Sequence, residues 1–189
     1  MDHWLYNTKV IHAARALQQG SVIAYPTEGV WGLGCDPANE QALLKILLLK
    51  NRPINKGVIL VAANIGQFTP YLAGLSDAER ATLAASWPGP NTWVIPHNGF
   101  APSWIRGDHQ SLAVRVSDHP VVAALCHLFG GPIVSTSANP GGLPPARTPT
   151  QVRRYYRNEP IVYAPGSVGS NGQPTQIRDL RSGQILRSA

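Results

Sequence analysis

Long apolar runs, signal-peptide features and paired cysteines are all lacking in this sequence. No apolar stretch approaches the roughly 20 residues that span a bilayer. The N-terminus carries Asp2, Trp4 and Tyr6 where a secretory signal would have a basic start and an apolar core. Cys35 and Cys126 form no CxxC pair, so we expect two buried thiols, with a single disulfide as the alternative. These absences predict a soluble, cytoplasmic protein without a membrane segment.

The signatures of several enzyme classes are lacking as well. No GxxxxGK[ST] phosphate loop and no GxSxG nucleophile elbow occur, and Gly32-Leu33-Gly34 lacks the third glycine of a dinucleotide fingerprint. The 6 histidines show no HExxH or other paired-ligand spacing, so we expect no metal site made of protein side chains. We interpret Cys126 and His127 as ordinary helix residues rather than a catalytic pair.

Acidic residues are few, and the excess positive charge lies near the C-terminus. The chain has 16 Lys and Arg against 10 Asp and Glu, a net charge of +6. Residues 147–189 hold seven arginines against Glu159 and Asp179, so this segment alone accounts for +5. A clustered basic segment attracts polyanions such as nucleotides or RNA. For Arg153, Arg154 and Arg157, a solvated helix face is an equally good interpretation.

Helix and strand patterns alternate along the chain, with Gly29–Gly34 expected as a glycine-rich turn. The expected helices begin at Asn7 or Thr8, Asn39, Asn64, Ser76, His119 and Thr148, and the expected strands cover 21–25, 57–63, 91–96, 111–116, 133–136, 161–164, 176–180 and 184–187. Strands separated by helices of about ten to fifteen residues predict an α/β fold. The mixture of crossover and hairpin spacings predicts a mixed sheet with flanking helices, in one domain over 1–189.

Polar side chains gather where three of these elements end. Thr27 and Glu28 follow the first strand, although an ordinary turn would also explain them. Lys50, Arg52 and Lys56 follow a helix end, where cations are favoured by the helix dipole but would also suit a triphosphate. The third cluster, Ser135-Thr136-Ser137-Ala138-Asn139, lies at the end of a buried strand, where α/β sheets bind ligands; an Asx-rich turn is the alternative.

Five sequence blocks, taken in order, resemble the YrdC/Sua5 family from about residue 8 to 187. They are Tyr25-Pro26-Thr27-Glu28 with Gly32-Leu33-Gly34, Lys50-Asn51-Arg52-Pro53, Trp87-Pro88-Gly89-Pro90-Asn91-Thr92, Leu112-Ala113-Val114-Arg115-Val116 and Ser135-Thr136-Ser137-Ala138-Asn139. The resemblance implies a twisted open α/β sheet, here called YrdC-like, with a large basic concave cavity. It also implies synthesis of threonylcarbamoyl-adenylate and pyrophosphate from L-threonine, bicarbonate and ATP with Mg²⁺, for threonylcarbamoyladenosine modification of tRNA.

The resemblance assigns roles to residues at the matching positions. Lys50 and Arg52 are expected to contact the phosphates and to be catalytic. The other expected ATP contacts are Lys56, Ser111, Ser137, Asn139 and Arg187, and the expected threonine contacts are Thr27, Arg115, Ser135 and Thr175. Gly29, Pro140-Gly141 and Pro145 depart from the usual family residues, so the threonine contact at Gly29 is expected through the backbone alone and one adenosine contact is expected to differ.

Two other functions compete with synthesis of the adenylate. A non-catalytic protein could hold tRNA or double-stranded RNA in the same basic cavity, and a paralogue could run another nucleotide-dependent reaction. In this family the later transfer to tRNA belongs to the TsaD-TsaB-TsaE complex. The sequence leaves open whether the chain contacts RNA or that complex.

Overall fold

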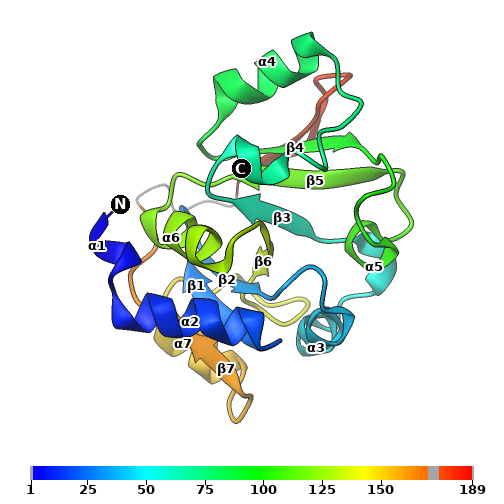
Figure 1. The fold of residues 1–189 in the computed structure, drawn as a ribbon. Coiled ribbons are helices and arrows are strands. Elements are labelled where there is room, and N and C mark those ends of the chain that lie inside the picture. Colours follow the sequence, from blue (N-terminus) through cyan, green and yellow to red (C-terminus); the bar gives the residue numbers. More distant parts are fainter. Residues whose placement is uncertain (1, 170–174, 189) are drawn as a thin grey trace.

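The computed structural model describes residues 2–169 and 175–188, and within them one mixed sheet forms the centre of the protein (Figure 1). Its nine strands follow the order β7-β1-β2-β6-β3-β5-β4-β8-β9. Their bounds are β1 Val22–Pro26, β2 Trp31–Gly34, β3 Ile59–Ala62, β4 Asn91–Pro96, β5 Ser111–Val116, β6 Ile133–Ser137, β7 Ile161–Tyr163, β8 Gln176–Asp179 and β9 Ile185–Arg187. Three neighbouring pairs, β1 with β7, β3 with β5 and β4 with β8, are parallel and the others antiparallel. The predicted mixed α/β fold is confirmed.

Most helices begin where the sequence predicts them. Their bounds are α1 Asp2–Leu5, α2 Thr8–Gln18, α3 Glu40–Lys50, η1 Ile54–Lys56, η2 Ile65–Phe68, α4 Asp77–Ser86, α5 Ser103–Arg106, α6 Pro120–Phe129 and α7 Pro149–Tyr155. The side chain of Asn39 caps α3 by accepting from the Ala42 N–H at 3.0 Å. Asn51, with φ 49°, ends α3 in the left-handed conformation. This helix end carries the first cations of the candidate site.

Alternating side chains build a separate core on each face of the sheet. In β1, Ile23 and Tyr25 pack with the buried residues of α2 and α6, which lie side by side in Figure 1. Val22 and Ala24 point to the other face and pack with the buried residues of α3. This two-sided burial explains the continuous apolar strands of the sequence.

The expectation of a turn over Gly29–Gly34 is wrong from Trp31 onward, where the chain forms β2. This strand lies inside the sheet between β1 and β6. Its glycines make room for the buried ring of Tyr25, because a Cβ added at Gly34 would lie 2.8 Å from Tyr25 Cε1. The glycines of β2 therefore serve close packing, a reason that local pattern does not reveal.

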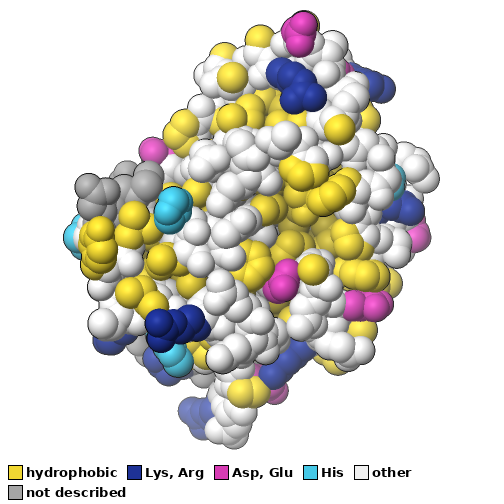
Figure 2. All heavy atoms as spheres, viewed as in Figure 1, with side chains coloured by type: hydrophobic (Ala, Val, Ile, Leu, Met, Phe, Trp, Pro, Cys, Tyr) yellow, Lys and Arg dark blue, Asp and Glu magenta, His cyan; other side chains and the backbone are white. Residues whose placement is uncertain are grey.

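Surface and core features agree with other parts of the sequence analysis. Cys35 and Cys126 are buried free thiols, as expected. No helix among the described residues is both long and apolar enough to cross a membrane. Figure 2 shows a band of hydrophobic side chains between α4 and α3, with Lys and Arg scattered around the margin of this face.

Candidate active site

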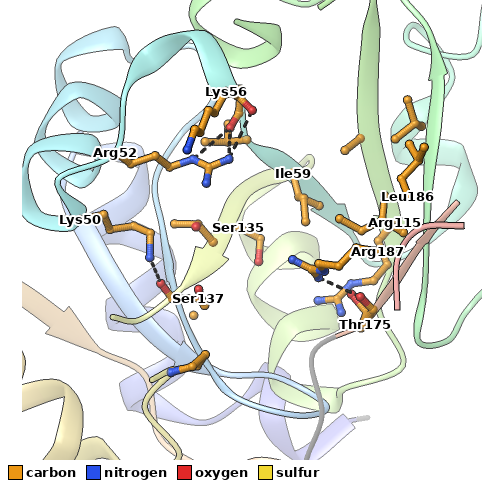
Figure 3. A pocket seen from close by; sticks show the side chains of 18 of the residues that line it. Lys50, Arg52, Lys56, Ile59, Arg115, Ser135, Ser137, Thr175, Leu186 and Arg187 are labelled. Atoms are coloured by element: carbon orange, nitrogen blue, oxygen red, sulfur yellow. Dashed lines mark hydrogen bonds between the residues drawn. The ribbon is translucent and has the colours of Figure 1, made fainter. Parts of the chain in front are cut away.

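A hollow with a volume of about 760 Å³ opens over the middle of the sheet (Figure 3). Strand register builds its floor, because Ile59 of β3 lies beside Ala113 of β5 and Ser135 of β6, and Val94 of β4 lies on the far side of Ala113. These side chains share the sheet face of the α2–α6 core, beyond the part that α6 covers. The floor thus combines apolar and small polar groups.

All eleven residues expected to bind substrates line this cavity. They are Thr27, Lys50, Arg52, Lys56, Ser111, Arg115, Ser135, Ser137, Asn139, Thr175 and Arg187. The sequence spreads them over 161 positions, and the crossed order of the strands brings them together. Convergence of this kind is typical of a ligand site in an α/β sheet. The individual roles of these residues stay predictions.

Lys50 lies at one end of the cavity and holds the turn that follows β6. Its Nζ donates to the carbonyl oxygen of Ser137, to the carbonyl oxygen of Asn139 at 2.8 Å and to Asn139 Oδ1 at 3.3 Å. Ser137 Oγ donates to the same Oδ1 at 2.6 Å. Burial, assisted by repulsion from Arg52, lowers the pKa of Lys50 to about 8. The ammonium is therefore held by oxygen acceptors in a site that disfavours its charge, so a ligand anion here would stabilise it.

Arg52 is fixed by the backbone that leads into β3. Its Nε and Nη2 donate to the Gly57 carbonyl oxygen at 3.3 and 2.8 Å, and Nη2 also reaches the Lys56 carbonyl oxygen at 3.3 Å. Burial lowers the pKa of this guanidinium. Nη1 forms none of these bonds and stays available to an anion. Lys56 is exposed and lines the cavity next to it.

Arg115 and Arg187 lie close together across the cavity from Lys50 (Figure 3). Arg187 Nη2 donates to the Thr175 carbonyl oxygen at 2.8 Å, and Thr175 Oγ1 lies 3.1 Å from Thr92 Oγ1. Burial, followed by repulsion from Arg115 and Arg52, lowers the pKa of Arg187. Two guanidinium groups so near to each other favour a bound anion between them.

A buried carboxylate lies behind Arg115. Glu28 Oε2 is 3.3 Å from Arg115 Nη1, and both side chains are buried. Burial raises the pKa of Glu28, but Arg115 and the hydrogen bond from Ser117 outweigh it, so the pKa lies below its ordinary value. Thr27, just before it, turns its Oγ1 to the Val30 carbonyl oxygen at 2.7 Å. The sequence pattern singled out Glu28 without giving it a role.

The cavity is basic. Its cationic lining residues are Lys50, Arg52, Lys56, Arg106, Arg115 and Arg187, and no Asp or Glu occurs among the described lining residues. Within the described chain, Arg115 is the one member of this set with a carboxylate partner. A cavity lined by cations without carboxylates suits a polyanionic ligand. Guanidinium and ammonium groups bind phosphate oxygens well, so a triphosphate fits this description.

Arg106 and His109 are lining residues that sequence reasoning missed. Arg106 ends the short helix α5, and its Nη1 donates to the His109 carbonyl oxygen at 2.9 Å. Gly57 lets this loop approach, since a Cβ there would lie 2.6 Å from the Arg106 carbonyl oxygen. No pattern near Arg106 in the sequence indicates this contact with a segment 49 residues away.

Comparison with known proteins extends the likeness over the whole chain. The family model for Sua5, YciO and YrdC proteins, described as "Telomere recombination", matches residues 15–189. Threonylcarbamoyl-AMP synthase of Cellvibrio japonicus is 52% identical over 187 residues, which cover 99% of both chains. The protein of the same name from Saccharophagus degradans is 54% identical over 188 residues, covering 100% of this chain and 98% of its own.

Solved structures of Sua5 and YciO proteins also resemble this chain. The structure of Sua5 from P. abyssi complexed with L-threonine has a TM-score of 0.86 at 28% identity. The match covers 94% of this chain and 53% of that one, so this chain spans about half of that Sua5. E. coli YciO, at 22% identity, shares the fold with a TM-score of 0.82 over 95% of this chain and 88% of its own. With the family model matched over 15–189, the chain belongs to the Sua5/YciO/YrdC family.

Proposed function

We propose that this chain is a threonylcarbamoyl-AMP synthase, which makes threonylcarbamoyl-adenylate and pyrophosphate from L-threonine, bicarbonate and ATP. The product would serve the threonylcarbamoyladenosine modification of tRNA. One observation carries the proposal: the cations at and after the end of α3, the hydroxyl groups of β6 and Arg115 of β5 all line one cavity. Relatives of equal length that bear this name support it.

The chemistry needs positioning and charge stabilisation more than a covalent nucleophile. The amino group of threonine joins bicarbonate with loss of water, giving a carbamate. A carbamate oxygen then attacks the α-phosphorus of ATP, and the bond to the bridging oxygen breaks so that pyrophosphate leaves with the electron pair. Negative charge collects on the phosphate oxygens in the transition state, which fixed cations stabilise.

The residues that line the cavity would divide into two groups. Lys50 and Arg52 would hold the phosphates and be the catalytic cations. Lys56, Ser111, Ser137, Asn139 and Arg187 would complete the ATP site, and Thr27, Arg115, Ser135 and Thr175 would hold threonine. The threonine complex of the P. abyssi neighbour supports an amino-acid subsite in this fold.

Mg²⁺ would enter with the nucleotide. The described lining residues include no Asp or Glu, and no group of three metal-ligating side chains occurs among residues 2–169 and 175–188. We therefore assign the ion to phosphate oxygens and water, where it would neutralise charge on the triphosphate. The protein residues would bind the remaining phosphate oxygens.

The test is pyrophosphate release by the purified protein from ATP, bicarbonate and Mg²⁺, with and without L-threonine. We expect release that depends on threonine and yields the adenylate, detected by mass spectrometry. Absence of release from folded protein that retains RNA would favour a non-catalytic RNA-binding protein instead. The arginines of α7 are the observation that favours this second function.

We also propose that residues 1–189 act as one domain in the cytoplasm, where threonine and ATP are available. Continuity of one sheet across the described chain supports a single domain. The adenylate would then pass to the TsaD-TsaB-TsaE complex, in keeping with the family resemblance. Whether it passes by direct contact is a separate question that a pull-down with those proteins would answer.

A further inference from the structure

Glu28 is a buried carboxylate placed against one cation of the cavity. Its Oε2 lies 3.3 Å from Arg115 Nη1. The exposed fractions are 8% for Glu28 and 5% for Arg115, so water screens this pair little. Arg115 lines the cavity, whereas Glu28 is absent from the lining residues and stands behind it. Arg115 is therefore the lining side chain through which the Glu28 carboxylate can act on a ligand.

Glu28 is itself held from the opposite side. Its Oε1 accepts a hydrogen bond from Ser117 Oγ at 2.7 Å and from the Asp118 N–H at 3.1 Å. Ser117 Oγ in turn accepts from the His119 N–H at 3.2 Å. Oε1 thus has fixed partners in the segment after β5, whereas Oε2 faces Arg115 and accepts no hydrogen bond from the described residues. This arrangement makes Glu28 a rigid anchor for the guanidinium.

The contact with Glu28 uses one edge of Arg115 and leaves another free. Nη1 faces the carboxylate, while Nε is buried and has no hydrogen-bond partner among the described residues. An unpaired buried N–H is unfavourable, but Nε is closed off from the cavity, so a ligand would satisfy it only after a small shift of the guanidinium. After such a shift, the edge formed by Nε and Nη2 has the geometry that binds a carboxylate through two parallel hydrogen bonds.

We propose that Glu28 is a positioning and specificity residue: it orients Arg115 toward the carboxylate of the amino-acid substrate and keeps triphosphate away from that subsite. The proposal rests on the proposed function. Charge separates the two subsites, because Glu28 neutralises Arg115 while Lys50, Arg52 and Arg187 have no carboxylate partner in the described chain. A polyanion gains most at the unneutralised cations. A monoanionic amino acid needs only one oriented guanidinium.

The experiment measures steady-state kinetics of Glu28→Gln with tripolyphosphate as a probe. We expect the KM for threonine to rise about tenfold or more while the KM for ATP stays within about twofold, since only one subsite loses its organisation. Tripolyphosphate should become a competitive inhibitor against threonine, because Arg115 then carries an unneutralised charge. A purely structural role would lower kcat without creating that competition. Unchanged threonine KM and unchanged inhibition in folded Glu28→Gln would overturn the proposal.

Three further variants make the result decisive. Glu79→Gln is the matched control, because Glu79 pairs with Arg181 at 3.0 Å on α4 and lies outside the cavity. Glu28→Asp keeps the charge and should recover the exclusion of tripolyphosphate. If Glu28→Gln fails to fold by circular dichroism, Ser117→Ala replaces it, and its threonine KM should rise about threefold. An unchanged threonine KM in that variant contradicts the anchoring role.

Failure of the proposed function gives a different result from failure of this inference. Wild-type protein without threonine-dependent pyrophosphate release would contradict the synthase. Calorimetric titration of L-threonine into wild type and Glu28→Gln needs no turnover, and it still tests the role of Glu28. We expect an affinity about tenfold weaker in the variant. Equal affinities would contradict the role whatever the reaction is.

Discussion

Lys50 is the side chain whose loss should matter most. Lys50→Ala removes a cation and leaves the oxygen acceptors at Ser137 and Asn139 without their donor. We expect kcat/KM for ATP to fall about 100- to 1,000-fold, the usual effect of removing one fixed donor from developing charge. Pyrophosphate release measures it, with Lys9→Ala on the exposed face of α2 as control. A loss below about fivefold would remove Lys50 from the catalytic residues.

The charge of Lys50 also predicts a pH dependence. Its pKa of about 8 lies below the ordinary lysine value, because burial and then Arg52 disfavour the ammonium. The folded chain therefore binds fewer protons than the unfolded chain between about pH 8 and the ordinary value, and stability should rise with pH there. ATP affinity changes in the opposite direction, because the cation is lost as pH rises through about 8.

We accordingly expect kcat/KM for ATP in the wild type to decline above about pH 8. In Lys50→Arg the decline should move to higher pH, since a guanidinium keeps its charge. Pyrophosphate release by the two proteins, measured between about pH 7 and 10, compares the pH at which kcat/KM declines. A decline at the same pH in both proteins would assign the titration to another group.

Glycines of β2 provide a prediction about an element of the fold. Gly34→Ala would place a Cβ 2.8 Å from Tyr25 Cε1 and nearer still to the Val134 carbonyl oxygen. Overpacking of this kind should lower the free energy of unfolding by about 1–3 kcal/mol. Gly131→Ala is the matched control, because no described atom would lie within 4 Å of its new Cβ. Urea denaturation of both variants should separate them clearly.

The same strand marks the limit of local sequence patterns. Strands β4 and β5 were predicted with their bounds, because apolar runs between turn residues identify them. In β2, Trp31-Gly32-Leu33-Gly34 has the composition of a turn, and the packing that makes it a strand comes from Tyr25. Helices α1, η1 and α5 were missed since elements of three or four residues depend on tertiary contacts.

The residues of the candidate site were predicted better than the contacts that hold them in place. The family resemblance identified eleven of the residues that line the cavity. It did not reveal that Glu28 is the partner of Arg115. Glu28 and Arg115 are 87 residues apart, and only the order β1-β2-β6-β3-β5 brings their elements together. Arg106 was missed for the same reason. Sequence patterns identify polar residues at the ends of strands. Which of these residues contact each other depends on the order of the strands in the sheet.

The distribution of charge over the entire chain separates two surfaces. The cavity extends over β6, β3, β5, β4 and β8, whereas α7 and the edge strand β7 line a second hollow with Arg153, Arg154 and Arg157. Arg153 lies over the ring of Tyr163 at 3.9 Å. None of these three arginines forms an ion pair within the described chain. If RNA contacts the protein, this surface offers it cations that ATP does not use.

The two surfaces should therefore respond to mutation independently. Replacing Arg153, Arg154 and Arg157 together by Ala should leave pyrophosphate release within about twofold of the wild type, because none of them lines the cavity. Retention of tRNA should weaken, and the slope of its logarithmic salt dependence should fall by about 2, as expected when three phosphate contacts are lost. Lys50→Ala should show the reverse behaviour, with RNA retention kept and turnover lost. If the triple variant retains tRNA with an unchanged slope while Lys50→Ala loses it, RNA and ATP share the cavity, and the binding-protein alternative gains its support there.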